Sequence, residues 1–165
     1  MTSALKIFSG IAIAAALCAP AVAEDGLLTQ KSLSLGMAQA IAIGAMESCK
    51  AMGYRISVAV LDRDGLTMVM LRGDGAGLHT PEGAERKAYT ARTFRIPSGE
   101  FAQRVKDNPT ISAVHLTGII AAQGALPIKV GDDVIGAVGV SGAPGGEKDE
   151  ACSKAGIDKV ADQLK

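Results

Sequence analysis

The chain has 165 residues, with 17 Lys and Arg against 17 Asp and Glu, and 48% of it is hydrophobic while 3% is aromatic. This apolar content excludes a chain that stays disordered for want of a core, and the charge balance excludes a strongly basic nucleic-acid-binding protein. The charges are unevenly distributed. All acidic residues follow position 23, and Lys6 is the only charged residue before it.

The first 23 residues have the pattern of a secretory signal peptide. Lys6 gives a short positive region, residues 7–19 form an apolar run, Pro20 breaks it, and residues 21–23 (Ala-Val-Ala) match the small-x-small cleavage pattern. An uncleaved membrane anchor needs roughly 17 to 25 apolar residues, so this run is too short. We expect cleavage before Glu24, a periplasmic or secreted product, and no stable membrane insertion afterwards.

The expected mature chain, residues 24–165, is one domain of ordinary size. Without Lys6 it carries 16 Lys and Arg against 17 Asp and Glu, and this near-neutrality argues against long-range attraction to nucleic acid or an anionic membrane. Its two cysteines, Cys49 and Cys152, lie near its two ends. Export permits a disulfide between them, two buried free thiols are the alternative, and the sequence leaves both open.

Several segments have the spacing or the end signals of helices. Small and apolar residues recur at steps of three and four, Gly53 follows the first such segment, and Pro81 stands in the first turn of the second. The predicted helices are 29–52 (with Thr29 or Ser34 as N-cap), 81–94, 98–105 and 147–164.

The remaining patterned segments predict two hairpins. Residues 55–62 and 66–72 flank an Asp-Gly turn, and residues 126–130 and 134–141 flank Gly-Asp-Asp. The stretch from Thr110 is ambiguous. Because hairpins require an antiparallel sheet and the apolar helix faces must cover it, we predict an α/β/α layered domain of α+β type.

Common enzyme signatures are absent from the sequence, which has no GxSxG, no GxxxxGK phosphate loop, no HExxH and no paired CxxC. The most informative stretch is residues 72–94. It gathers one of the two histidines, several cations and two glutamates around a predicted helix start.

Three kinds of side chain in this stretch have both a functional interpretation and a purely structural one. Glu82 and Glu85 could bind a cation, but two carboxylates alone make a weak site and more often stabilise a helix start. His79 could ligate haem iron or be merely solvated. Arg86 and Lys87 could pair with a propionate or form a solvated face.

Taken together, the motifs resemble the haem-binding family of GlcG and HbpS type, which also forms the C-terminal domain of PduO-type cobalamin adenosyltransferases. The matching pieces cover nearly all of residues 24–165 in order. They are 57–62 with Gly65, 71–72 with 74–76, 86–91, 124–128 and 134–142, continuing through 146–152.

The resemblance implies a profilin-like fold, with a five-stranded antiparallel sheet flanked by helices, and assembly into homo-oligomers. It associates Glu82 and Glu85 with an acidic iron-binding motif, and it places Lys87 and Thr90 in a shared Lys-Ala-Tyr-Thr segment. The chain departs from the family at Gly73, where a Met is frequent, and at residues 124–126, which replace a run of glycines.

The first functional hypothesis is an exported haem-binding protein that handles or senses haem or iron. Haem would be held noncovalently, because the sequence has no CxxCH, in an apolar cleft bordered by residues 72–94 and the Gly124 loop. The predicted cofactor-binding residues are Arg72, Asp74, His79, Arg86, Lys87 and Thr90, and the predicted metal ligands are His79, Glu82 and Glu85.

Two further hypotheses belong to other classes. The second is an enzyme or accessory factor acting on a small organic acid or corrinoid, with Asp74 and Lys87 as its acid/base pair. The third is an oligomeric scaffold without a tight ligand. The expected partners are therefore haem or another small molecule and further copies of the chain.

Overall fold

The computed structural model describes residues 26–165, so the predicted signal segment lies outside the described residues. The elements alternate between helices and hairpins in the predicted order. The helices are α1 Leu35–Ala51, α2 Thr80–Phe94, α3 Ser98–Asp107 and α4 Gly146–Asp158, and the strands are β1 Ser57–Leu61, β2 Thr67–Arg72, β3 Ala125–Val130 and β4 Asp133–Ser141. Two short 3-10 turns span Ser112–His115 and Ala161–Gln163.

The strands form one antiparallel sheet in the order β2-β1-β4-β3. Ser57 on β1 lies opposite Arg72 on β2 and opposite Ser141 on β4. The five-stranded sheet implied by the family resemblance is not confirmed, because four strands are present among residues 26–165. The ambiguous stretch after α3 contains a 3-10 turn and no strand.

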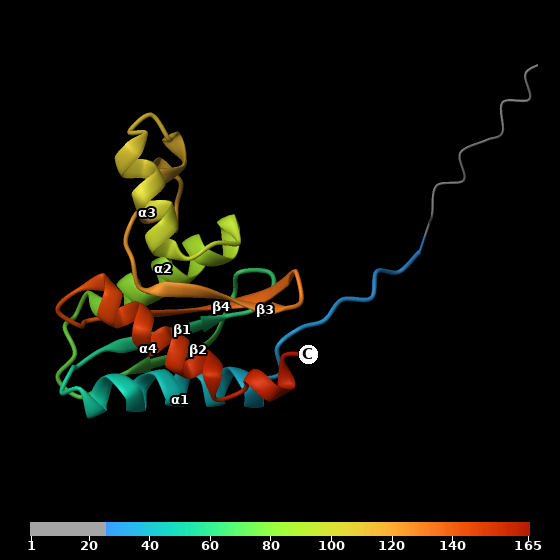
Figure 1. The fold of residues 1–165 in the computed structure, drawn as a ribbon, viewed down its shortest axis with the longest axis horizontal. Coiled ribbons are helices and arrows are strands. Elements are labelled where there is room, and N and C mark those ends of the chain that lie inside the picture. Colours follow the sequence, from blue (N-terminus) through green and yellow to red (C-terminus); the bar gives the residue numbers. More distant parts are fainter. Residues whose placement is uncertain (1–25) are drawn as a thin grey trace, which may run out of the picture.

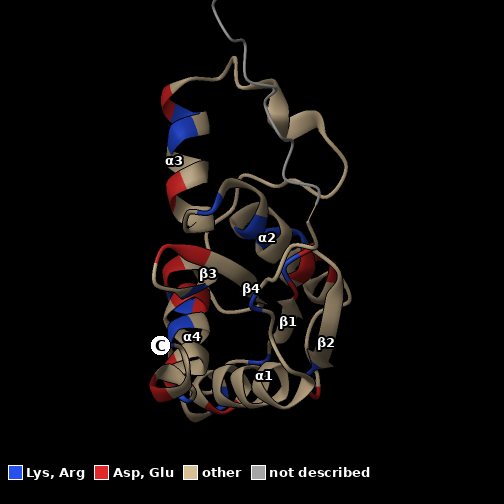
Figure 2. Ribbon diagram, turned by 90° about the vertical axis from the view of Figure 1, so that its right-hand side faces the viewer, with Lys and Arg blue, Asp and Glu red and all other residues tan. Residues whose placement is uncertain are grey.

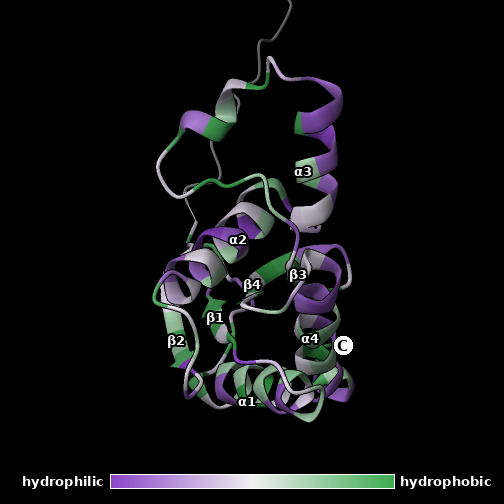
Figure 3. Cartoon of the chain, turned by 90° about the vertical axis from the view of Figure 1, so that its left-hand side faces the viewer, coloured by the Kyte–Doolittle hydropathy of each residue, from purple (hydrophilic) through white to green (hydrophobic). Residues whose placement is uncertain are grey.

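Helices cover both faces of this sheet, which confirms the predicted α/β/α layers (Figure 1). Alternation along β1 divides its side chains: Val58 and Val60 pack with α1 and α4, whereas Ala59 and Leu61 pack with α2. Figure 3 shows β1 and β4 as strongly hydrophobic strands between the helices. The main core therefore lies on the α1/α4 face, and a second core of small residues lies beneath α2.

A disulfide joins the two helices of the α1/α4 layer. Cys49 on α1 and Cys152 on α4 are both fully buried, and their Cα atoms are 5.6 Å apart. The sequence left a disulfide and two free thiols open, and the structure contains the disulfide. The bond links positions 103 residues apart.

Gly139 on β4 allows α2 to pack directly on the sheet. A Cβ at this position would overlap the carbonyl oxygen of Ala84 and lie 2.8 Å from the backbone nitrogen of Ala88. We expect Gly139→Ala to lower the free energy of unfolding by about 1–3 kcal/mol, as overpacking does, in urea denaturation followed by circular dichroism. Gly36→Ala, at an exposed site on α1 with its nearest neighbouring atom 4.0 Å away, is the control and should not destabilise. Equal stability of the two variants would contradict this account of the α2 interface.

Charges are spread over the surface without a dominant sign. Figure 2 shows that α3 and α4 each carry basic and acidic residues, and exposed pairs such as Arg104–Glu100 and Lys154–Asp158 join charges one helical turn apart. Within residues 26–165, every helix is too short or too polar to cross a membrane. Because neither sign of charge dominates this surface, a functional site on it has to be identified from local clusters of side chains.

Candidate functional site

A cleft of about 460 Å³ lies where β4 ends and where α2 and α4 begin. We call it the glycine-lined cleft, because six of its lining residues are glycine or alanine: Gly77, Ala122, Gly142, Ala143, Gly145 and Gly146. Its polar lining includes Arg55, His79, Lys87 and Asp149. A volume of this size is typical of small-molecule sites.

Two glycines with positive φ lie at or beside this cleft: Gly142 lines it, and Gly124 packs against its buried residues Lys87 and Asp149. At Gly142 (φ +128°) a Cβ would lie 2.6 Å from the carbonyl oxygen of Arg55. At Gly124 (φ +138°) it would lie 2.8 Å from the ammonium nitrogen of Lys87 and 2.8 Å from Cβ of Asp149. Side chains are excluded at both places, so the loops approach closely and leave a side-chain-poor wall.

A buried ion pair lies at the inner end of the cleft and connects helices on opposite faces of the sheet. Lys87 Nζ on α2 donates to Asp149 Oδ2 on α4 at 2.8 Å and to the carbonyl oxygen of Val140 at 3.1 Å. The backbone N–H of Ala143 donates to Asp149 Oδ1 at 3.0 Å. Lys87 and Asp149 are 7% and 3% exposed.

Burial dominates the titration of Asp149. It raises the pKa of the carboxyl above the ordinary aspartate value, while the hydrogen bonds from Lys87 and from the Ala143 N–H oppose the rise. The ion pair is therefore hydrogen-bonded at both of its partners, although burying its two charges costs free energy. Removing one partner would leave the other charge buried without a counter-ion and destabilise the fold.

The pairing of Lys87 corrects two expectations. Lys87 is not on a solvated face, and its carboxylate partner is Asp149 rather than Asp74. Asp74 lines a different cavity, so the proposed Asp74–Lys87 acid/base pair is not formed. The sequence analysis missed Asp149 as a site residue, although it lies in the 146–152 piece that carried the family resemblance.

His79 is the N-cap residue of α2 and lies exposed in the lining of the glycine-lined cleft. Its side chain makes no capping hydrogen bond. A Cβ on Gly77 would lie 3.0 Å from its Cε1, so the glycine leaves room for the ring. Thr80 fixes this turn instead, with its hydroxyl donating to the carbonyl oxygen of Gly77 at 2.8 Å.

The two glutamates of the predicted metal site have partners elsewhere. Glu82 pairs with Arg86 at 3.2 Å, and the hydroxyl of Thr67 on β2 donates to Glu85 at 2.6 Å. Across residues 26–165 no group of three or more His, Cys, Asp or Glu side chains is placed to hold a metal ion. The structure thus does not bring His79, Glu82 and Glu85 together as a ligand set.

Arg86 and Thr90 contact the segment that follows the 3-10 turn rather than the cleft. Arg86 Nη2 donates to the carbonyl oxygen of Ile119 at 2.9 Å. The hydroxyl of Thr90 accepts from the N–H of Ile120 at 2.9 Å and donates to the carbonyl oxygen of Arg86. These contacts hold the 119–120 segment against α2.

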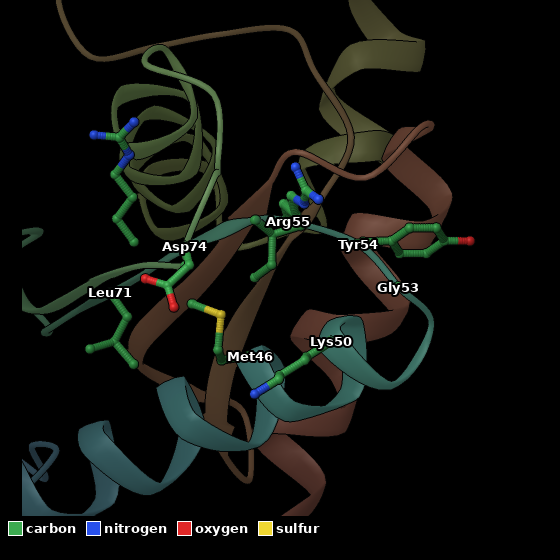
Figure 4. A pocket seen from close by; sticks show the side chains of 10 residues that line it. Met46, Lys50, Gly53, Tyr54, Arg55, Leu71 and Asp74 are labelled. Atoms are coloured by element: carbon green, nitrogen blue, oxygen red, sulfur yellow. The ribbon is translucent and has the colours of Figure 1, made fainter.

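Arg72 and Asp74 line a second cavity, of about 540 Å³, which we call the α1–β2 cavity. It is lined by Met46 and Lys50 of α1, residues 53–56 and residues 71–74. Figure 4 shows Met46 projecting from α1 toward Leu71 and Asp74. Arg55 lines both cavities. The six predicted cofactor-binding residues are therefore not brought together: Arg72 and Asp74 line the α1–β2 cavity, His79 and Lys87 line the glycine-lined cleft, and Arg86 and Thr90 contact residues 119–120.

Comparison with known proteins adds independent information on the family. Residues 33–158 match the family model described as haem-degrading protein HbpS-like. Protein GlcG of Escherichia coli strain K12 is 30% identical over 115 residues, which cover 68% of this chain and 84% of GlcG.

Solved structures extend this likeness to the fold. The crystal structure of HbpS is 38% identical, covers 83% of this chain and 97% of its own, and gives a TM-score of 0.77. The crystal structure of a PduOC–haem complex is 23% identical, with a TM-score of 0.72 over 78% of this chain and 95% of its own, and therefore shares the fold alone. Sequence and fold agree that this chain belongs to the HbpS-like family.

Proposed function

We propose that this chain is an exported haem-binding protein that holds haem noncovalently in the glycine-lined cleft, with His79 as the iron ligand. The main observation behind the proposal is the position of His79, an exposed imidazole without a capping hydrogen bond, in the lining of a cleft that also contains six glycine and alanine residues. Neutral imidazole is a common haem ligand, and the stretches of glycine and alanine in the wall leave room for a flat macrocycle beside it.

The relatives support the same ligand. The matching family model is described as haem-degrading, and PduOC, which shares the fold, has been crystallised with haem. Function follows from the site rather than from the fold, so the residues of the cleft carry the proposal. When bound, haem supplies an iron centre that takes an axial ligand from the protein.

The cation that faces a propionate in this proposal is Arg55. Arg86 is engaged by Glu82 and the Ile119 carbonyl, and Lys87 by Asp149. Arg55 lines the cleft, is exposed, and has no ion pair among residues 26–165. Its planar guanidinium matches a carboxylate in two parallel hydrogen bonds.

Iron bound without haem is less favoured by the contacts. Glu82 and Glu85 lie exposed on the first turns of α2, three residues apart, and each has a protein partner. Two carboxylates without further ligands make a weak cation site. The proposal therefore assigns iron to His79.

Export is part of the proposal, through removal of residues 1–23, and so is assembly into a homo-oligomer. The Cys49–Cys152 disulfide supports an oxidising destination, because such bonds persist mainly outside the reducing cytosol. The periplasm and the cell exterior both meet this condition.

Titration of the purified protein with hemin is expected to give a shifted Soret band that saturates with added hemin. In His79→Ala the band should move again, and hemin should bind about tenfold more weakly or worse, a loss of about 1.4 kcal/mol. His115→Ala is the matched control, because His115 is the only other histidine and lies exposed in the Ser112–His115 turn, outside the cleft lining. A flat titration of the unsubstituted protein, or identical spectra for His79→Ala and His115→Ala, would refute the proposal.

A further inference from the structure

The α1–β2 cavity is a second pocket, open to solvent on one side, into which the haem proposal places no part of the haem. It lies between α1 and the junction of β2 with the loop that follows it, and it is larger than the glycine-lined cleft, at about 540 Å³ against 460 Å³. Gly73 closes its inner side, with its N–H donating to the carbonyl oxygen of Ile56 at 2.9 Å. A Cβ on Gly73 would lie 3.4 Å from Sδ of Met46, so glycine permits this close approach.

The interior of the cavity is apolar. Met46 and Leu71 are partly buried and pack against the main core, and Ile56 is fully buried. Figure 4 shows Met46 projecting toward Leu71, whereas the ring of Tyr54 points outward at the rim. Such walls bind a hydrocarbon body by removing it from water.

The rim of the cavity is cationic. Lys50, Arg55 and Arg72 line it together with one carboxylate, Asp74, and none of these four makes an ion pair within residues 26–165. The rim therefore has a net charge of about +2 on a chain whose overall charge is zero. Arg72 is oriented by one Nη2 hydrogen bond to the Ala76 carbonyl oxygen at 2.8 Å, which leaves its other N–H groups available.

We propose that the α1–β2 cavity binds a small amphipathic carboxylate, with its aliphatic body against Met46, Ile56 and Leu71 and its carboxylate on the cations of the rim. An apolar space with a few convergent polar groups is the usual form of a small-molecule site. Arginine and lysine at the mouth select an anion over a neutral or cationic head group. The single carboxylate, Asp74, excludes a divalent-cation site by its ligand count.

The test uses sodium decanoate as the probe, with decanol and decyltrimethylammonium as analogues of the same chain length and different head-group charge. Isothermal titration calorimetry on the purified protein should show binding of decanoate, with at least tenfold weaker binding of both analogues. Lys50→Glu should weaken decanoate binding at least tenfold, and Lys50→Arg should retain it. Lys106→Glu makes the same charge change on exposed α3, outside the cavity lining, and should bind like the unsubstituted protein.

Three outcomes overturn the proposal: no decanoate binding, equal binding of decyltrimethylammonium, or equal effects of Lys50→Glu and Lys106→Glu. Circular dichroism of each variant establishes that it is folded before binding is compared.

The same variants separate this site from haem binding. Lys50→Glu should leave the hemin Soret titration unchanged, and His79→Ala should leave decanoate binding unchanged. If Lys50→Glu abolishes the Soret shift while His79→Ala does not, the α1–β2 cavity is itself the haem site, and the separate carboxylate site is wrong. If hemin fails to bind to any form but decanoate binds as described, the haem proposal fails and the carboxylate site stands.

Discussion

Replacing both Cys49 and Cys152 with alanine is expected to lower the free energy of unfolding by about 4 kcal/mol. The disulfide joins positions 103 residues apart, and in the chain-entropy account a loop of about 100 residues restricts the unfolded chain by roughly 4–5 kcal/mol. Alanine is chosen because both sites are fully buried, where a serine hydroxyl would need a new partner. Guanidinium denaturation followed by circular dichroism measures the change.

The control for this prediction is chemical. The unsubstituted protein, reduced while unfolded and refolded in the presence of reductant, should match the double alanine variant to within about 1 kcal/mol, since both lack the same constraint. A loss below about 1 kcal/mol in the variant would show that packing of α1 on α4 holds this layer without the bond.

This dependence connects the fold to the predicted export. α1 and α4 form one layer of the domain, and the bond fastens the C-terminal half of α1 to the middle of α4. A chain that stayed in a reducing compartment would lose this constraint. The disulfide is thus compatible with the export that we propose from the signal pattern of residues 1–23.

Local patterns in the sequence predicted most of the fold. Steps of three and four residues identified the helices, and the Asp-Gly turn identified the first hairpin, because both signals depend on residues close in the chain. The N-cap of α1 could not be chosen between Thr29 and Ser34. The structure selects Ser34, whose hydroxyl accepts from the Met37 N–H at 3.2 Å.

Features that depend on contacts between distant residues could not be predicted from those local patterns. Lys87 was predicted to bind the cofactor, with a solvated helix face as the alternative, but its position over the ends of β3 and β4 buries it against Asp149, 62 residues away. The last helix, predicted to run to Leu164, ends at Asp158, where 3-10 contacts from Lys159 and Val160 tighten the chain. The five-stranded sheet came from the family resemblance alone, and no local strand pattern supported a fifth strand.

The predicted site residues lie in different places in the structure, again because local sequence patterns do not report contacts between distant parts of the chain. Residues 72–94 are adjacent in sequence, but they run from the end of β2 through a loop into α2, so successive side chains face two cavities and a neighbouring loop. Arg55, which lines both cavities, lies outside this stretch. In the sequence, Arg55 was only a cation at the start of a predicted strand. Such residues are common in sheets, so nothing marked it as a site residue.

Replacing Lys87 with methionine is expected to lower the free energy of unfolding by about 3–5 kcal/mol at pH 8, because it leaves the buried Asp149 carboxylate without its counter-ion. Lys154→Met is the matched control, since Lys154 pairs with Asp158 on the exposed face of α4, where such pairs contribute less than about 1 kcal/mol. Equal losses in the two variants would contradict the buried-pair interpretation.

The pH dependence of the Lys87→Met variant gives a second, independent test of the same pair. Burial already raises the pKa of Asp149, and the hydrogen bond from Lys87 opposes that rise, so removing Lys87 should raise the pKa further. A carboxyl whose pKa is raised in the folded state contributes stability below its unfolded pKa and loses that contribution as the pH rises through the folded pKa. The deficit of Lys87→Met relative to the unsubstituted protein should therefore be smaller at pH 4.5 than at pH 8. Adding Asp149→Leu should remove both the pH dependence and much of the deficit, because a neutral apolar pair has no buried charge to compensate.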